Sequence, residues 1–357
     1  MSAPAPGDVT DVACLGESMV TFRPTRPGRL AEVPSFDRGI GGAESNVACT
    51  LALAGHRASW VSRVGSDGFG DYLTGAIEAC GVDTSLVGRD PNRPTGIYFR
   101  TAGERATSVD EPEGDEPLAE VAYYRQGSAA SAMSPENIAP ITRTEARILH
   151  LSGITAALSP DCRALLMELT EEREGRPLVS FDVNYRVNLW QDAAHASSVL
   201  REIARRSDLV FVGDDEAEAA WGITGGPEAI RAALPEPATL IVKQGAEGAT
   251  AFTRAAGADE AAYEKALKVD VVASVGAGDA FAAGYLSATL RDLPPAARLR
   301  HGHLLAAAAL TVPGDLGTPP ARAHADRLAA LPAAEWETLR LGPGWTTAGA
   351  SGEVVTT

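Results

Sequence analysis

Short runs of aliphatic and β-branched residues alternate with Ala- and Leu-rich segments along most of the 357-residue chain. This alternation predicts a mostly parallel sheet, because parallel strands need crossover connections, which are usually helices. We therefore expect an α/β fold of the doubly wound type with helices on both faces, including one helix with an apolar stripe at Val47, Leu51 and Ala54. The runs expected to form strands are 12–15, 59–64, 147–151, 178–182, 209–212 and 240–243.

Two segments break this alternation, residues 21–40 and residues 95–126. The first contains Pro and Arg and few helix formers, and the second contains two strand-like pieces, residues 96–100 and 121–125. We expect both segments to form hairpins outside the main sheet. Together they would make a small β-lid over the carboxyl ends of the central strands, which is where doubly wound sheets bind ligands.

The pattern predicts one domain over residues 11–335, with the lid inserted as residues 18–40 and 95–127. Within the second insertion, residues 110–120 are acidic and Pro-containing, which predicts a mobile loop. Residues 342–357 are rich in Gly, Thr and Ser and offer little to bury. We expect them to be a disordered tail.

The formal net charge of −16 makes nucleic acids and anionic membranes unexpected partners, because an acidic surface repels phosphate groups. No apolar run reaches the ~18 residues of a membrane span, and the N-terminus lacks the pattern of a signal peptide. The cysteines have no CxxC spacing and the histidines no metal-binding spacing, which disfavours a zinc site or a disulfide framework. We expect a cytoplasmic protein that acts on small molecules.

The most specific local feature is the turn Gly276-Ala277-Gly278-Asp279, which opens a helix of small residues after a strand-like run at 269–272. Glycines at a helix start let backbone N–H groups approach an anion, and the helix dipole favours negative charge there. Such a turn can hold the charge that develops on a phosphoryl group, while Asp279 accepts a proton from an alcohol. From these residues alone, an Asp that only complements the helix N-terminus explains the pattern equally well.

A resemblance favours the catalytic interpretation. Residues 276–284, GAGDAFAAG, resemble the C-terminal signature of the PfkB carbohydrate kinases, and residues 41–48 and 65–70 resemble the N-terminal one. The two motifs stand in the family's order and far apart in the chain. The resemblance implies a ribokinase-like fold and ATP-dependent phosphorylation of a sugar hydroxyl. It implies Asp279 as the base, the backbone of Gly276, Ala277 and Gly278 as an anion hole, Gly41 and Gly42 beside the sugar, and Asn46 on its hydroxyls.

Within that family, residues 16–19, 123–130, 151–155 and 182–186 resemble the 2-keto-3-deoxygluconate kinases. A sugar acid, unlike a neutral sugar, needs a guanidinium that can bind its carboxylate. The resemblance implies transfer to the 6-hydroxyl, giving 2-keto-3-deoxy-6-phosphogluconate. Each arginine could instead belong to the surface or to a structural ion pair, and each tyrosine could be lid packing. The residues that the resemblance places on the substrate are Tyr98, Tyr123, Arg125 and Arg186, with the arginines near its carboxylate.

The nucleotide side follows from the same resemblance. Lys243, Gly245 and Gly248 match the family's strand and turn beside the nucleotide, and Gly276 and Gly278 complete the predicted ATP site. A plain strand that ends in a Gly turn would show the same local pattern.

Two positions depart from the family pattern. Phosphoryl transfer needs Mg²⁺, and Glu216 keeps the acidic position that orders water around the metal, but Gly213 stands where Asn is usual. Ala273 replaces an Asp that binds a monovalent cation in K⁺-activated relatives. We therefore expect weak or absent activation by K⁺.

Three hypotheses remain from the sequence. The first is the 2-keto-3-deoxygluconate kinase, and the second is a related kinase for fructose or for 2-keto-3-deoxygalactonate. The third is a regulator that binds a sugar acid without catalysis, which the intact Gly276, Gly278 and Asp279 disfavour. A homo-oligomer formed through the lid is a further expectation from the resemblance.

Overall fold

The computed structural model describes residues 9–101, 120–142, 146–255 and 258–347. In this part of the chain, nine strands form one sheet in the order β13-β12-β11-β10-β9-β8-β1-β4-β5. The strands from β11 to β5 are parallel to their neighbours, whereas β12 and β13 pair antiparallel at one edge. The strands of this sheet are β1 Thr10–Leu15, β4 Ala58–Gly65, β5 Val87–Asp90, β8 Ala146–Ser152, β9 Leu178–Asp182, β10 Leu209–Gly213, β11 Thr239–Lys243, β12 Gly248–Ala255 and β13 Ala258–Lys265.

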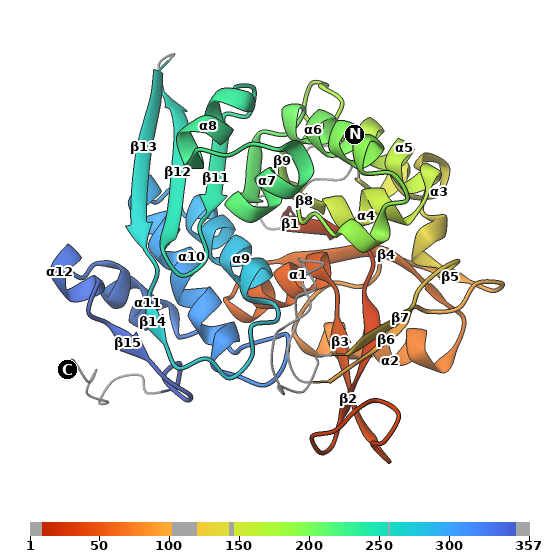
Figure 1. Ribbon diagram of the computed structural model, residues 1–357. Coiled ribbons are helices and arrows are strands. Elements are labelled where there is room, and N and C mark those ends of the chain that lie inside the picture. Colours follow the sequence, from red (N-terminus) through yellow and green to blue (C-terminus); the bar gives the residue numbers. More distant parts are fainter. Residues whose placement is uncertain (1–8, 102–119, 143–145, 256–257, 348–357) are drawn as a thin grey trace.

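Helices cover both faces of the sheet, with α9 and α10 (blue) on one side and α4 to α6 (green) on the other (Figure 1). On the first side, α1 packs against α9, and α9 packs against α10. The helices are α1 Ala43–Leu53, α2 Gly68–Ala79, α3 Pro135–Thr142, α4 Gly153–Leu158, α5 Pro160–Leu169, α6 Ala193–Arg205, α7 Asp214–Trp221, α8 Gly226–Ala233, α9 Ala277–Leu290, α10 Pro295–Leu310, α11 Arg322–Ala329 and α12 Ala333–Trp336, with short 3₁₀ turns at Ala130–Ala132 and Val187–Leu189.

The central strands are apolar throughout because both of their faces are buried. Successive side chains of a strand point to opposite faces. In β10, Leu209 and Phe211 join the core under α1, α9 and α10, whereas Val210 and Val212 join the core under α4 to α6. This two-sided burial explains why such strands read as continuous apolar runs in the sequence.

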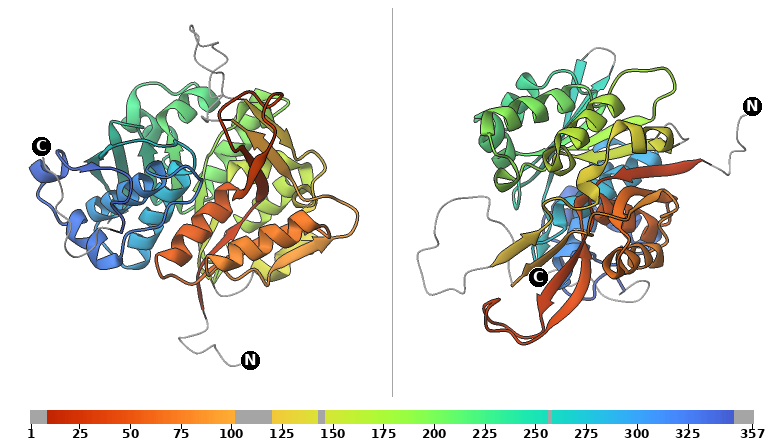
Figure 2. Two further views of the ribbon diagram at one scale, coloured as in Figure 1. Left: turned by 90° about the horizontal axis from the view of Figure 1, so that it is seen from below. Right: turned by 90° about the vertical axis from the view of Figure 1, so that its right-hand side faces the viewer.

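A second sheet, here called the lid sheet, lies outside the main one and has the order β3-β2-β6-β7. It consists of β2 Met19–Pro24, β3 Phe36–Gly41, β6 Ile97–Arg100 and β7 Val121–Tyr124. Because only three residues separate the carboxyl end of β1 from the start of β2, the lid sheet starts at the edge where the parallel strands end. In the right-hand view of Figure 2 its strands project from the body of the molecule.

The structure confirms the predicted α/β fold, the six expected strands, and the two hairpins outside the main sheet. Two local predictions are wrong. The run at 269–272 does not form a strand beyond β14, Lys268–Val269, which pairs with β15, Arg340–Leu341, and its last two valines are exposed. Residues 342–347 are not a frayed tail, because Trp345 is buried in the core with only 8% exposure.

Some predictions fall partly or wholly outside the described residues. The predicted loop at 110–120 is described only at Glu120, whose carboxylate binds Arg29 in the lid sheet's first hairpin. Residues 348–357 of the expected tail also lie outside. Among the described residues, no helix combines the length and the apolar character needed to cross a membrane.

Candidate active site

The predicted anion hole lies at the N-terminus of α9. Gly276 is the N-cap and has a φ of 73°, in the left-handed region that favours glycine. A Cβ at this position would lie 2.2 Å from the carbonyl oxygen of Asp315, so the chain has no room for a side chain here. The backbone N–H groups of the next residues belong to the first turn of α9 and have no partner within the helix. The turn can therefore present free donors and the positive end of the helix dipole to an anion.

Asp279 lies in that first turn and is bound by a residue from the other sequence motif. The side-chain amide of Asn46, on α1, donates a hydrogen bond to Asp279 Oδ2 over 2.8 Å. Burial raises the pKa of the Asp279 carboxyl to about 7, and the charge of Asp182 adds to the rise, whereas the bond from Asn46 lowers it. A carboxylate that titrates near neutral pH is suited to act as a general base.

A charged cluster lies beside the anion hole. The ammonium of Lys243, at the end of β11, contacts both carboxylate oxygens of Asp182 at 3.0 and 2.9 Å. The same Lys243 Nζ lies 3.9 Å from the position of a Cβ on Gly278 and 4.0 Å from Glu216 Oε2. Burial alone would lower the pKa of Lys243, but Asp182 and Glu216 raise it above its ordinary value. The ammonium is thus held in its charged form next to the predicted phosphoryl position.

Glu216 has a structural partner of its own. Its Oε2 atom accepts a hydrogen bond of 2.7 Å from the backbone N–H of Gly213, the residue that precedes α7. Among the described residues, no group of three or more His, Cys, Asp or Glu side chains could hold a metal ion. A Mg²⁺ ion bound here would take most of its ligands from phosphate oxygens and water.

Tyr98 and the Gly41-Gly42 turn meet at a residue that the sequence analysis missed. A Cβ on Gly41 would lie 2.3 Å from the Tyr98 hydroxyl oxygen and 2.7 Å from Asp315 Oδ2. The Tyr98 hydroxyl donates to Asp315 Oδ2 over 3.1 Å, and Arg100 Nη2 contacts Asp315 Oδ1 at 2.6 Å. Burial raises the pKa of Asp315, whereas the charge of Arg100 lowers it. Asp315 therefore stands between the lid sheet and the anion hole.

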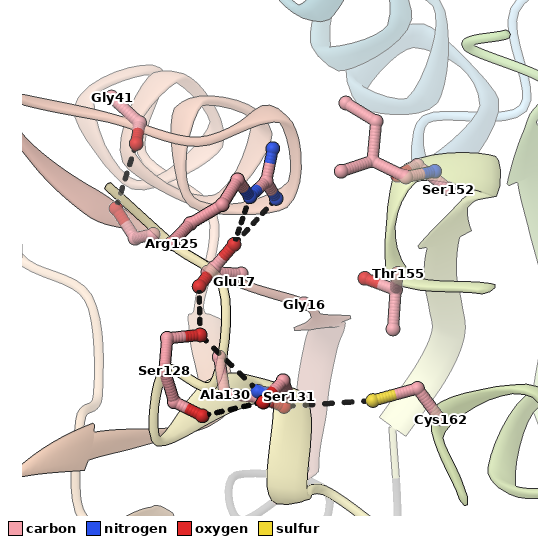
Figure 3. A network of polar contacts seen from close by, with 12 residues as sticks. Gly16, Glu17, Gly41, Arg125, Ser128, Ala130, Ser131, Ser152, Thr155 and Cys162 are labelled. Carbon is pink, nitrogen blue, oxygen red and sulfur yellow. Dashed lines mark hydrogen bonds and ion pairs between the residues drawn. The ribbon is translucent and has the colours of Figure 1, made fainter. Parts of the chain in front are cut away.

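Arg125 does not extend freely from the lid sheet. Its Nε donates to Glu17 Oε2 over 2.7 Å, and its Nη2 forms an ion pair with the same oxygen (Figure 3). Tyr123 is about half exposed, and its ring centroid lies 5.3 Å from that of the buried Tyr98. Arg186 is partly exposed, and its charge lowers the pKa of the carboxyl of Asp279, the predicted base.

The structure thus brings together Gly41, Asn46, Tyr98, Lys243, Gly276, Gly278 and Asp279 from distant parts of the chain. Gly245 lies in the turn that follows β11, and Gly248 is the first residue of β12. The sequence analysis missed Glu17, Arg100, Asp182 and Asp315 as site residues, although Glu17 and Asp182 stand in segments that carry the family resemblance. Asp315 had one usable signal, its place in a Pro-Gly-Asp turn after a long helix.

Comparison with known proteins identifies the family of this chain. The sequence model of the pfkB family carbohydrate kinases matches residues 9–322. This chain belongs to the pfkB family of carbohydrate kinases. Both signature motifs of this pfkB kinase fall within the matched range, and they are the segments that meet at Asp279.

Two curated relatives of this pfkB kinase share one name. A 2-dehydro-3-deoxygluconokinase from Bacillus subtilis (strain 168) is 34% identical over 87% of this chain and 93% of the relative. Another 2-dehydro-3-deoxygluconokinase, from Thermoproteus tenax, is 32% identical over 91% of this chain and 95% of the relative. A solved structure of an uncharacterized sugar kinase from Pyrococcus horikoshii in complex with ATP has a TM-score of 0.72 and 25% identity, and it covers 86% of this chain and 95% of that one. The protein is therefore a sugar kinase with a ribokinase-like fold.

Proposed function

We propose that this pfkB kinase transfers the γ-phosphoryl group of ATP to the 6-hydroxyl of 2-keto-3-deoxygluconate, giving 2-keto-3-deoxy-6-phosphogluconate. The name 2-dehydro-3-deoxygluconokinase, carried by two relatives over most of their length, denotes a kinase for the same compound. The observation that carries the chemistry is the position of Asp279, in the first turn of α9, bound to Asn46 and with a pKa near 7.

In this proposal Asp279 takes the proton of the attacking hydroxyl as the new O–P bond forms, and the bond from the γ-phosphorus to the bridging oxygen breaks to release ADP. The backbone N–H groups of Ala277 and Gly278, with the dipole of α9, stabilise the charge on the phosphoryl oxygens. Lys243 adds a positive charge within reach of Gly278. When bound, ATP supplies the phosphoryl group and Mg²⁺ neutralises its oxygens, and Glu216 would hold that ion through water.

The acceptor in this proposal lies between the Gly41-Gly42 turn and the lid sheet. Tyr98 and Asp315, which are within hydrogen-bonding distance of one another, offer a donor and an acceptor for sugar hydroxyls. Arg186, near Asp279, and Arg125, at the end of β7, supply the positive charge that a carboxylate requires.

The experiment that tests this assignment measures ADP formation with Mg²⁺ and ATP against a panel of acceptors. The panel contains 2-keto-3-deoxygluconate, 2-keto-3-deoxygalactonate, fructose and ribose. We expect the highest kcat/KM for 2-keto-3-deoxygluconate. A higher kcat/KM for fructose would leave the kinase in its family but refute a role for the two arginines in binding a carboxylate.

A non-catalytic regulator is the remaining alternative, and the same panel addresses it. Binding of a sugar acid measured by calorimetry, without ADP formation for any acceptor, would support it. We expect turnover, because a binding protein has no use for a carboxylate of raised pKa beside an anion hole.

A further inference from the structure

The side chain of Glu17 is wholly buried, with 0% exposure, in the loop between β1 and β2. A buried carboxylate is costly unless its charge is paired and its oxygens are hydrogen-bonded. Glu17 meets both conditions. Its Oε2 atom binds Arg125, and its Oε1 atom accepts a 2.5 Å hydrogen bond from the Ser128 hydroxyl (Figure 3).

The geometry of the pair fixes the direction of the guanidinium. Both contacts to Glu17 use the edge of Arg125 formed by Nε and Nη2. The third nitrogen, Nη1, is not used by Glu17 and points away from it (Figure 3). The Glu17 carboxylate has little room to move, because a Cβ on Gly96 would lie 3.0 Å from its Oε1 atom.

The backbone of the same loop supports the other half of the acceptor site. A Cβ on Gly42 would lie 2.5 Å from the carbonyl oxygen of Glu17, so the Gly41-Gly42 turn packs directly on this residue. Ser45 Oγ donates to Ser18 Oγ over 2.8 Å and to the carbonyl of Gly42 over 3.0 Å, which ties α1 to the loop. Glu17 therefore fixes the position of Arg125 relative to the glycine turn.

We propose that Glu17 is a positioning residue that sets acceptor specificity. By holding the Nε–Nη2 edge of Arg125, it presents the opposite end of the guanidinium to the carboxylate of the sugar acid while the Gly41-Gly42 turn receives the sugar chain. This inference rests on the proposed function, and it deepens it by naming the residue through which Arg125 distinguishes an acid from a neutral sugar.

If Glu17 acted only through its charge, neutralising it would lower the KM for the acid, whereas loss of positioning would raise that KM. The negative charge of Glu17 offsets the positive charge of Arg125, so removing it would strengthen the attraction for an anionic substrate. If Glu17 positions Arg125, removing its charge should weaken binding of the acid. Without Glu17 the guanidinium is no longer oriented, and it loses side-chain conformational entropy when the substrate binds. The KM for the acid after neutralising Glu17 separates the two roles.

The test compares the wild type with Glu17→Gln on two acceptors. One is 2-keto-3-deoxygluconate, and the other is 3-deoxyfructose, its neutral analogue with a hydroxymethyl group in place of the carboxylate. We expect KM for the acid to rise about tenfold, a typical loss for one charge-assisted hydrogen bond. The kcat for the acid and the KM for the neutral analogue should stay within about twofold, since the base and the anion hole are untouched.

A matched control is Asp259→Asn, which neutralises the acid of another two-pronged Arg–carboxylate pair, with Arg231 on α8. It should leave both KM values unchanged. If Glu17→Gln does not fold, Arg125→Lys gives a second test. The lysine ammonium can keep the ion pair with Glu17 but has no further nitrogen to bind the substrate carboxylate. Arg125→Lys should therefore raise the KM for the acid and leave the KM for the neutral analogue unchanged.

A double-mutant cycle tests whether Glu17 acts through Arg125. If Glu17 acts through Arg125, then Glu17→Gln should add nothing to the KM for the acid once Arg125→Gln is present. An unchanged or lower KM for the acid in Glu17→Gln, with wild-type activity on the acid intact, overturns the inference and leaves the proposed function standing. A wild type that phosphorylates only neutral sugars overturns both, and that outcome is visible before any variant is made.

Discussion

Asp279 shows how single residues in this protein take their chemistry from partners distant in the sequence. Its carboxyl is pulled toward the neutral form by burial and by Asp182, and toward the charged form by the amide of Asn46. Asn46 and Asp279 stand in the two signature motifs, so the hydrogen bond between them joins α1 to α9 at the proposed base. The pKa of about 7 at Asp279 is therefore set first by burial, and then by Asn46 and Asp182, which come from two other segments.

The first prediction concerns the acidic limb of the pH profile. The base must be ionised, so kcat/KM should rise with pH through an apparent pKa of about 7. In Asn46→Ala the hydrogen bond that lowers the pKa of Asp279 is lost, and the limb should move to higher pH. Asn137→Ala, at a helix distant in sequence from both motifs, is the control and should leave the limb in place. A limb that is unchanged or moves to lower pH in Asn46→Ala would refute this coupling.

At the scale of the elements, the lid sheet is joined to the loop after α10 by buried charges. Arg100 and Tyr98 of β6 both bind the Asp315 carboxylate, and Arg23 of β2 binds the carbonyl of Pro313. The carbonyl of Asp315 in turn limits the space at Gly276. The lid sheet, this loop and the anion hole are thus one packed unit.

The second prediction concerns the free energy of unfolding after the Arg100–Asp315 ion pair is removed. Removing one partner of a buried ion pair leaves an uncompensated charge, so Arg100→Gln should lower the free energy of unfolding by about 3 kcal/mol. The control is Arg340→Gln, whose pair with Asp270 is about half exposed and should be worth less than about 1 kcal/mol. Urea denaturation at pH 7 measures both. Equal effects for the two variants would show that the Arg100 pair does not stabilise the fold.

The third prediction concerns the segment that leads into α9. Ala273 offers a methyl group where K⁺-activated relatives have a carboxylate, and its backbone N–H, like that of Val272, is directed at the carbonyl of Leu310. We expect K⁺ and tetramethylammonium at equal ionic strength to give kcat values within about twofold. A tenfold rise in activity with K⁺ would mean that other oxygens complete a cation site here.

The sequence predicted the elements where the signal was local. Buried strands such as β9 and β10 are apolar on both faces, so their runs were found within a residue or two. The strand predicted at 269–272 is wrong after β14, because its last two valines are exposed and a β-branched run pairs in a sheet only where it can be buried. The hairpin of β12 and β13 was missed because β13 is mostly exposed and carries Asp, Glu and Lys.

In the molecule as a whole, four of the positive charges of this acidic chain lie on the side of the sheet that carries the lid sheet. Lys243, Arg186, Arg125 and Arg100 come from four different segments and lie at or near the carboxyl edge of the sheet and the lid sheet. The motifs predicted Asp279 and its glycines. They could not predict that Asp182, Asp315 and Glu17 partner these cations, because such pairs depend on tertiary proximity between segments up to about two hundred residues apart.

The fourth prediction concerns assembly. Within the described residues β7 is an edge strand of the lid sheet. Tyr124, 65% exposed, and Tyr123, 49% exposed, leave apolar surface on it. An exposed apolar edge strand is a ready surface for pairing with a second copy. We expect a homodimer by multi-angle light scattering and a monomer for Tyr124→Lys. A wild type that remains monomeric at about 100 µM would contradict assembly through the lid sheet.

The proposed acceptor and the proposed base are tested together by measuring ATP-dependent phosphorylation of 2-keto-3-deoxygluconate by the wild type and by Asp279→Asn, with the product identified by ³¹P NMR. Asn keeps the shape of the side chain but cannot accept the proton. We expect a 6-phosphate product from the wild type and a fall in kcat of about 10²–10⁴-fold in the variant. A variant that keeps more than a tenth of the wild-type kcat, or a product phosphorylated elsewhere, would contradict it.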